Sequence, residues 1–154
     1  MDIKTKFAEC LIYNIRDDGT PQFLVLKRSP DIKIYPHIWQ IVTGTIEENE
    51  NAYECILREI KEETGITPKR FFIFPKVNQF YSPYDDSVNL VPVFIAEAAN
   101  ETVSISEEHS EYFWGSYDEA LEKIFMLTQK EILTYFNGFL KNKELFKTLI
   151  EINI

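Results

Sequence analysis

Short apolar runs and one longer helical repeat dominate the pattern of hydrophobic and polar positions along the chain. Six apolar runs of strand length are bounded by polar or turn-forming residues, namely 8–15, 23–27, 39–42, 71–80, 89–96 and 111–115. The first two runs flank the turn-forming residues 17–21, so we expect them to form a hairpin. A polar loop is expected over residues 81–87.

The central segment has the period of an amphipathic helix. Asn51 is a favourable N-cap residue, and Glu54 three positions later completes a capping-box pattern. Gly65 suits the position just after a helix, where a left-handed conformation is common. An apolar stripe recurs at steps of three and four residues, at Tyr53, Ile56, Leu57 and Ile60.

Two further helix starts are predicted towards the end of the chain. Ser116 with Glu119, and Thr128 with Glu131, have capping-box spacing. The tail over 128–149 is expected to be mostly helical, with an interruption near residues 137–138. Strands and helices therefore alternate, which predicts an α/β (α+β) fold with a mixed sheet between helices.

Length and composition are those of one soluble domain over residues 1–154. Hydrophobic residues make up 45% and charged residues 27% of the chain, and no linker or repeat divides it. No apolar run approaches the roughly 20 residues that span a bilayer, and the N-terminus lacks an apolar signal core. Cys10 and Cys55 are read as small buried residues. We expect a cytoplasmic protein that does not associate with membranes.

The net charge of −9 limits the choice of partners. An acidic surface repels long polyanions, so binding of nucleic-acid polymers, RNA decapping included, is not expected. A small anionic substrate remains compatible with this charge if a metal ion or a few basic side chains assist locally.

A cluster of carboxylates on the central helix is the densest polar feature. Glu59, Glu62 and Glu63 lie at i, i+3 and i+4, so their side chains share one face although like charges repel there. Hard divalent cations bind such oxygen ligands, and magnesium combines a few carboxylates with phosphates and water. The alternative is an ordinary solvated acidic face.

The spacing of the residues around this cluster favours a metal site over a solvated acidic face. Residues 44–66 read Gly44-x5-Glu50-x7-Arg58-Glu59-Ile60-x-Glu62-Glu63-x-Gly65-Ile66, and this segment resembles the Nudix box at every defining position. The family often has Gly-Glu where this chain has Asn49-Glu50. Because Asn tolerates a left-handed conformation well, we expect the loop to form nevertheless.

The resemblance implies a Nudix-type α/β/α sandwich and a phosphoanhydride hydrolase that uses Mg²⁺ or Mn²⁺. Glu59 and Glu63 would be the main metal ligands, with Glu62 as a further ligand or as the acceptor of the water's proton. Gly44 would let the chain turn and would bring its carbonyl to the metal. Arg58 would orient a carboxylate through its i±4 neighbours, Glu54 and Glu62.

The catalytic base often lies outside the box in this family. The candidate here is Glu108, with Glu107 and Glu111 as substitutes and a surface loop acid as the plain alternative. His109 is read as an incidental loop residue. Implied ligands of the metal are therefore Gly44, Glu59, Glu62, Glu63 and Glu108.

A second, narrower resemblance concerns the substrate. The segment Trp39-Gln40-Ile41-Val42-Thr43-Gly44 and the run from Glu108 to Trp114 are similar to those of the dihydroneopterin triphosphate pyrophosphatase group, also described as acting on dATP. This similarity implies cleavage of a nucleoside or pterin triphosphate to monophosphate and pyrophosphate.

Candidate substrate contacts are Arg28, Trp39, Gln40 and Tyr81. Arg28 could grip phosphate oxygens in a fork, whereas Lys27 should point to the opposite face of its strand. Trp39 and Tyr81 could stack on a base or pterin ring, with core packing or loop cover as the alternative for each. The loop over 81–86 is the candidate substrate-facing element.

Two other functions remain open at this point. One is a hydrolase of diadenosine polyphosphates or damaged nucleotides. The other is a non-catalytic Nudix-fold module that binds nucleotides, although such modules usually lose the box glutamates that this chain retains. A homodimer is compatible with the sequence, but no segment indicates an interface.

Overall fold

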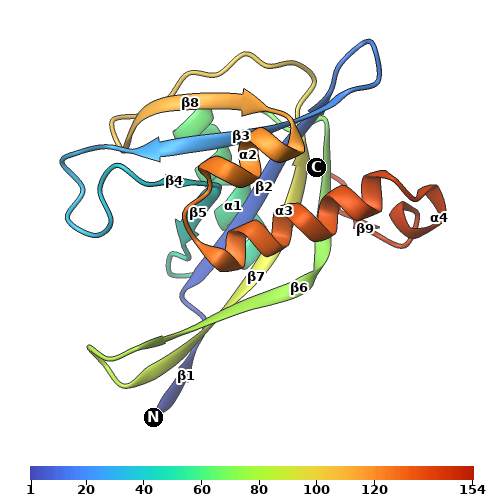
Figure 1. Cartoon of the computed structure of the whole chain (residues 1–154). Helices are drawn as coiled ribbons and strands as arrows, with labels where there is room; N and C mark the ends of the chain where they lie inside the picture. Colours follow the sequence, from blue (N-terminus) through green and yellow to red (C-terminus); the bar gives the residue numbers. More distant parts are fainter.

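The computed structural model describes residues 1–154 and places helices on both faces of one sheet (Figure 1). The nine strands are β1 (Asp2–Lys4), β2 (Phe7–Ile15), β3 (Pro21–Arg28), β4 (Trp39–Gln40), β5 (Val42–Thr45), β6 (Arg70–Ser82), β7 (Ser87–Glu97), β8 (His109–Gly115) and β9 (Ile150–Glu151). The four helices are α1 (Ala52–Thr64), α2 (Tyr117–Lys123), α3 (Leu127–Leu140) and α4 (Lys143–Phe146). None of these helices is both long and apolar enough to cross a membrane.

The sheet is mixed, as predicted. Its main path runs β4-β3-β2-β7-β6-β9, while β5 pairs with β2, β8 with β3, and β1 with β7. The pairs β1–β7 and β2–β7 are parallel, and the remaining pairs are antiparallel. The predicted hairpin is confirmed by the register of β2 and β3, in which Tyr13 pairs with Phe23.

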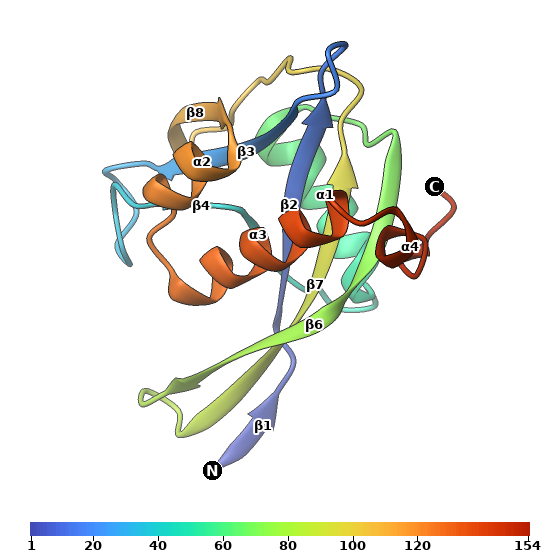
Figure 2. The same ribbon diagram turned by 45° about the vertical axis from the view of Figure 1, so that its right-hand side comes forward.

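Alternation along the central strands divides the core into two layers. One layer includes Leu11, Tyr13 and Phe136 and packs under α2 and α3, whereas the other includes Cys10 and Ile56 and packs under α1. The two faces are visible in Figure 2, where α3 crosses one side of the sheet and α1 lies on the other. Burial of both strand faces explains why the strands read as continuous apolar runs.

The local signals of α1 are confirmed. Asn51 accepts a hydrogen bond from the Glu54 backbone at 3.1 Å, and the Glu54 carboxylate accepts one from the Asn51 backbone at 3.1 Å. Gly65 ends the helix in the left-handed conformation, with φ of 72°. Both ends of the helix that carries the glutamate cluster are therefore fixed by local chemistry.

Two predictions for the C-terminal region are wrong. The helix α3 begins at Leu127 without any side-chain cap, so Thr128 and Glu131 do not form the predicted capping box. The helix also continues through residues 137–138 to Leu140. Asn137 is buried there, and packing of α3 on the sheet outweighs its weak helix propensity.

The sequence pattern also missed parts of the sheet. The strands β1 and β9 were not predicted, and β6 and β7 extend further than expected, leaving a turn over residues 83–86. The outer part of this hairpin projects from the body together with β1 (Figure 1). These strands are short or solvent-exposed, so they lack the apolar runs that reveal a buried strand.

Replacing Gly65 with Ala should lower the free energy of unfolding by about 1–2 kcal/mol, because a side chain in the left-handed region is strained. The added Cβ would also lie 3.3 Å from the Cβ of Ser104. Urea unfolding monitored by circular dichroism measures the change. Gly138→Ala is the control, since its Cβ would have no neighbour within 4 Å in the last turn of α3, and it should leave stability unchanged or raise it. Equal effects of the two variants would contradict the argument.

Candidate active site

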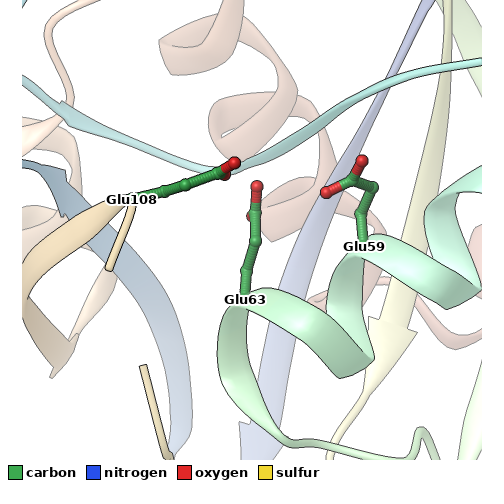
Figure 3. Close-up of side chains that lie close together, drawn as sticks. All are labelled: Glu59, Glu63 and Glu108. Atoms are coloured by element: carbon green, nitrogen blue, oxygen red, sulfur yellow. The ribbon is translucent and has the colours of Figure 1, made fainter. Parts of the chain in front are cut away.

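Three carboxylates from two parts of the chain converge beside the edge strand β5. Glu59 and Glu63 project from successive turns of α1, and Glu108 reaches them from the segment just before β8 (Figure 3). One oxygen from each of the three lies within 4.8 Å of the others. Glu63 is only 3% exposed, so the solvated acidic face that was the alternative does not describe this residue.

Gly44 allows α1 to approach β5 closely. A Cβ at this position would overlap the Glu59 side chain and would lie 3.0 Å from Cys55 Sγ. Gly44 lies inside a strand and does not have a positive φ, so the expectation that it lets the chain turn is wrong. Gly44 matters here because it has no side chain, which leaves room for the carboxylates beside the strand backbone.

The carboxylate cluster lacks positive charge in its interior. Burial, and then the charges of Glu59 and Glu108, raise the pKa of Glu63 to about 9. Burial is also the main cause that raises the pKa of Glu59. The Oε2 atom of Glu63 is buried without any hydrogen-bond partner. Three converging carboxylates with one unpartnered oxygen are a donor set that fits a hard divalent cation.

Arg58 supplies the positive charge at the rim of the cluster. Its Nε donates to Glu50 Oε1 at 2.7 Å and its Nη2 to Glu50 Oε2 at 2.9 Å, which is a two-pronged ion pair. Its Nη1 donates to Glu59 Oε1 at 2.8 Å and to Glu62 Oε2 at 3.3 Å. The guanidinium holds the pKa of Glu50 down at about 2 and fixes the orientation of Glu59.

The expected partnership of Arg58 with Glu54 is wrong. The Glu54 carboxylate is occupied at the helix N-terminus, where it accepts from the Asn51 backbone. Glu50 is instead the main partner of Arg58. The sequence shows Glu50 only as a position of the box, and no helical spacing connects it with Arg58, because Glu50 lies in the loop before α1.

The carboxylates form one wall of a cavity of about 330 Å³. Three polar residues on or beside other strands also line it, namely Arg28, Gln40 and His109. Arg28 is its one guanidinium, and the Nε of Arg28 is buried without a hydrogen-bond partner. Lys27 points elsewhere, as strand alternation predicted, and its Nζ lies 2.8 Å from Glu111. Phe7, Thr43 and Thr45 line the cavity from the other side of β5.

His109 belongs to this cavity and is not an incidental loop residue. It begins β8, is 5% exposed, and its Nε2 lies 3.3 Å from Gln40 Nε2. Burial, followed by the charge of Arg28, lowers the pKa of His109 to about 4, so its imidazole is neutral at pH 7. The pairing of β8 with β3 brings it opposite Arg28, a contact that no local pattern could reveal.

Three predicted site residues lie outside the cavity or the carboxylate cluster. Glu62 lines a neighbouring hollow together with Glu63 and Glu108 but is not part of the three-carboxylate cluster. The Trp39 ring contacts the ammonium of Lys123, 4.7 Å from the ring centroid, on the outside of the cavity. Tyr81 lies on the projecting hairpin, where its hydroxyl donates to Asp86 at 3.1 Å.

Comparison with known proteins agrees with this geometry. The model of the NUDIX domain matches residues 7–136, which is most of the chain. The chain belongs to the Nudix family. Its unusual Asn49 has φ of 65°, which confirms that Asn can adopt the left-handed conformation in this version of the Nudix box.

Individual relatives support the same assignment. The nucleoside triphosphatase NudI of Escherichia coli K12 is 30% identical over 108 residues, which are 65% of this chain and 75% of NudI. The C. elegans Ap4A hydrolase has a TM-score of 0.73 at 24% identity, covering 89% of this chain and 98% of its own. The E. coli dihydroneopterin triphosphate pyrophosphohydrolase has a TM-score of 0.71 at 21% identity, covering 86% and 97%. The fold is thus that of the Nudix proteins, and the chain is a phosphoanhydride hydrolase.

The buried Glu63 should make stability depend on pH in protein stripped of divalent cations with EDTA. Because the pKa of Glu63 is raised from 4.5 to about 9 on folding, the folded protein keeps a proton between these pH values that the unfolded chain has released. The resulting contribution to stability is fully present below about pH 4.5 and is lost as the pH rises to about 9. The loss is at most about 1.4 kcal/mol for each pH unit. Urea unfolding between pH 5 and 9 should show a smaller fall for Glu63→Gln than for the wild type. Glu122→Gln, on the exposed surface of α2, should behave as the wild type does, and equal slopes for all three proteins would refute the assignment.

Proposed function

We propose that the chain is a metal-dependent pyrophosphohydrolase that cleaves a nucleoside or pterin triphosphate to the monophosphate and pyrophosphate. The observation that carries this proposal is the cavity with three converging carboxylates on one wall and Arg28 on another. Such a cavity can hold a polyphosphate between a cation site and a guanidinium. The similarity to NudI and the Trp39–Gly44 segment support a triphosphate as substrate.

Mg²⁺, or Mn²⁺, is the cofactor that the carboxylates suit. Glu59, Glu63 and Glu108 would hold it, with the Gly44 carbonyl as a nearby oxygen donor. When bound, the ion supplies positive charge to the polyphosphate and lowers the pKa of a coordinated water. Arg58 keeps Glu59 turned towards the cluster, so that this ligand is in place before the ion binds.

The residues of the chain can then be given separate tasks. Arg28 binds phosphate oxygens through its fork, and Gln40 contacts the substrate from the same part of the cavity. A water oxygen forms a bond to phosphorus, the anhydride bond on the opposite side breaks, and its electron pair leaves with pyrophosphate. We assign the proton of that water to Glu62, which lies beside the cluster without being part of it.

A panel of substrates tests the proposed function. Dihydroneopterin triphosphate, the dNTPs and NTPs, and diadenosine tetraphosphate are each incubated with Mg²⁺, with Mn²⁺ and with EDTA, and the products are separated by ion-exchange chromatography. We expect pyrophosphate and a monophosphate from a triphosphate, and no turnover in EDTA. Glu63→Gln should lower kcat at least about 100-fold, while Glu122→Gln should retain normal activity.

Other outcomes of this panel point to the alternatives. Preferred cleavage of diadenosine tetraphosphate would favour the alternative, a hydrolase of diadenosine polyphosphates. The chain is similar in fold to one protein of that name, the C. elegans Ap4A hydrolase. Binding of nucleotides without turnover of any compound would favour the non-catalytic module. Normal turnover by Glu63→Gln in Mg²⁺ would remove this glutamate from the proposed machinery.

Arg28→Ala should reduce kcat/KM by roughly 10- to 100-fold, mainly through KM, because the lost bonds are made to a charged phosphate in both ground and transition states. Lys27→Ala is the matched control, since the neighbouring Lys27 pairs with Glu111 instead of lining the cavity. Steady-state kinetics with the best substrate measures both variants. An unchanged KM in Arg28→Ala would exclude a role for this residue in substrate binding.

A further inference from the structure

A polar cluster on the sheet face next to the cavity has no part in the proposed reaction. Glu9 of β2 accepts two hydrogen bonds, from Asn78 Nδ2 to Oε2 at 2.6 Å and from Gln129 Nε2 to Oε1 at 3.2 Å. The other end of the Gln129 amide is fixed, because its Oε1 accepts from the Ile41 backbone at 3.1 Å. The donors of Gln129 are therefore turned towards Glu9, and each oxygen of Glu9 keeps a lone pair for another donor.

The register of the sheet places Glu9 beside the cavity. Glu9 pairs directly with Thr43, and Phe7 with Thr45, so these four side chains share one face. Opposite residues in such a pair have Cβ atoms about 4.5–5.5 Å apart. Phe7, Thr43 and Thr45 line the cavity. Because β5 pairs only with β2, no further strand covers this edge of the sheet. Glu9 does not itself line the cavity but lies directly beside the lining residue Thr43.

The cluster is short of hydrogen-bond donors. Asn78 is 4% exposed, and its Oδ1 is buried without a partner. Burial is the main cause that raises the pKa of Glu9, against the two amide hydrogen bonds and the nearby charge of Lys76. Additional N–H donors would therefore stabilise the ionised carboxylate and satisfy the Asn78 oxygen.

We propose that Glu9 and Asn78 form a specificity site that binds the ring of the substrate through adjacent N–H and NH₂ donors. Guanine and pterins both present these two donors side by side, on the edge of the 2-amino-4-oxopyrimidine ring that they share. A carboxylate can accept from both donors at once, in the two-pronged geometry that it also forms with a guanidinium. Adenine instead presents an acceptor nitrogen beside its amino group, which opposes a carboxylate. The inference rests on the proposed function for its substrate class.

Two aromatic residues offer a surface for the flat side of such a ring. The rings of Phe7 and Phe80 have centroids 5.9 Å apart, and Phe80 is 47% exposed. Phe80 is two residues from Asn78 along β6, so both side chains lie on the same face of that strand. The ring would thus meet acceptors at its edge and apolar carbon on its face.

Binding of monophosphates tests this inference without requiring turnover. Isothermal titration calorimetry with dGMP and dAMP should show at least about 10-fold tighter binding of dGMP by the wild type. Glu9→Gln should weaken dGMP binding by roughly 10- to 100-fold and leave dAMP binding within about 3-fold. Glu97→Gln is the control, because its carboxylate also accepts a hydrogen bond on the sheet, from the Tyr13 hydroxyl at 3.2 Å, but Glu97 lies at the end of β7, beyond Val93, the residue that pairs with Glu9.

Each outcome decides between the specificity role and a purely structural one. Equal affinities of the wild type for dGMP and dAMP, including no measurable binding of either, would overturn the inference. So would an unchanged preference in a folded Glu9→Gln. Asn78→Ala provides a second variant that should also lose the preference, whether or not Glu9→Gln folds. A preserved binding preference without hydrolysis of any triphosphate would refute the proposed function alone.

Discussion

Mutual repulsion among three carboxylates that converge on the buried Glu63 is the constraint on which the rest of this site depends. Glu59, Glu63 and Glu108 are brought together although only Glu63 is buried, Glu59 being half-buried and Glu108 exposed. Burial and mutual repulsion raise the pKa values of Glu59 and Glu63. The chain does not relieve this cost by placing a basic side chain among them. It fixes one oxygen of Glu59 through Arg58, and Arg58 in turn is held by the fully paired Glu50. Rigid placement of Glu59 beside Glu63 and Glu108, neither of which has a basic partner, is an arrangement that a divalent cation would stabilise.

The edge strand β5 determines on which face of the sheet the carboxylates lie. Its alternation sends Gly44 towards α1 and the carboxylates, and sends Thr43 and Thr45 to the opposite face of the sheet. Because β5 pairs with β2 alone, no further strand closes the sheet at that point. One cavity can therefore be lined from both faces, by Gly44 and the carboxylates on one side and by Thr43 and Thr45 on the other.

Much of this arrangement follows from the sequence where the interactions are local. The capping residues of α1 and Gly65 are governed by neighbours within a few positions, and they are found as expected. Of the three helical carboxylates, Glu59 and Glu63 come together as expected, whereas Glu62 stays outside the cluster. Long-range pairing explains the failures. His109 is recognisable only once β8 lies against β3, and Glu9 meets Gln129 across 120 positions of the chain. The predicted capping box of Thr128 and Glu131 is absent, because α3 begins at Leu127 without a capping side chain.

Charge distribution also fixes how a substrate would lie. The chain has a net charge of −9, and the cavity offers a single guanidinium beside a neutral His109. Within the cavity, the phosphates of the proposed substrate can therefore be neutralised only by Arg28 and by a cation held at the carboxylate cluster. At the other end, the carboxylate of Glu9 repels phosphate but accepts N–H groups. The carboxylate cluster and the proposed ring site at Glu9 would thus differ in what they bind, since the first needs a cation and the second needs donor hydrogens. This difference would orient a triphosphate in one direction before any chemistry begins.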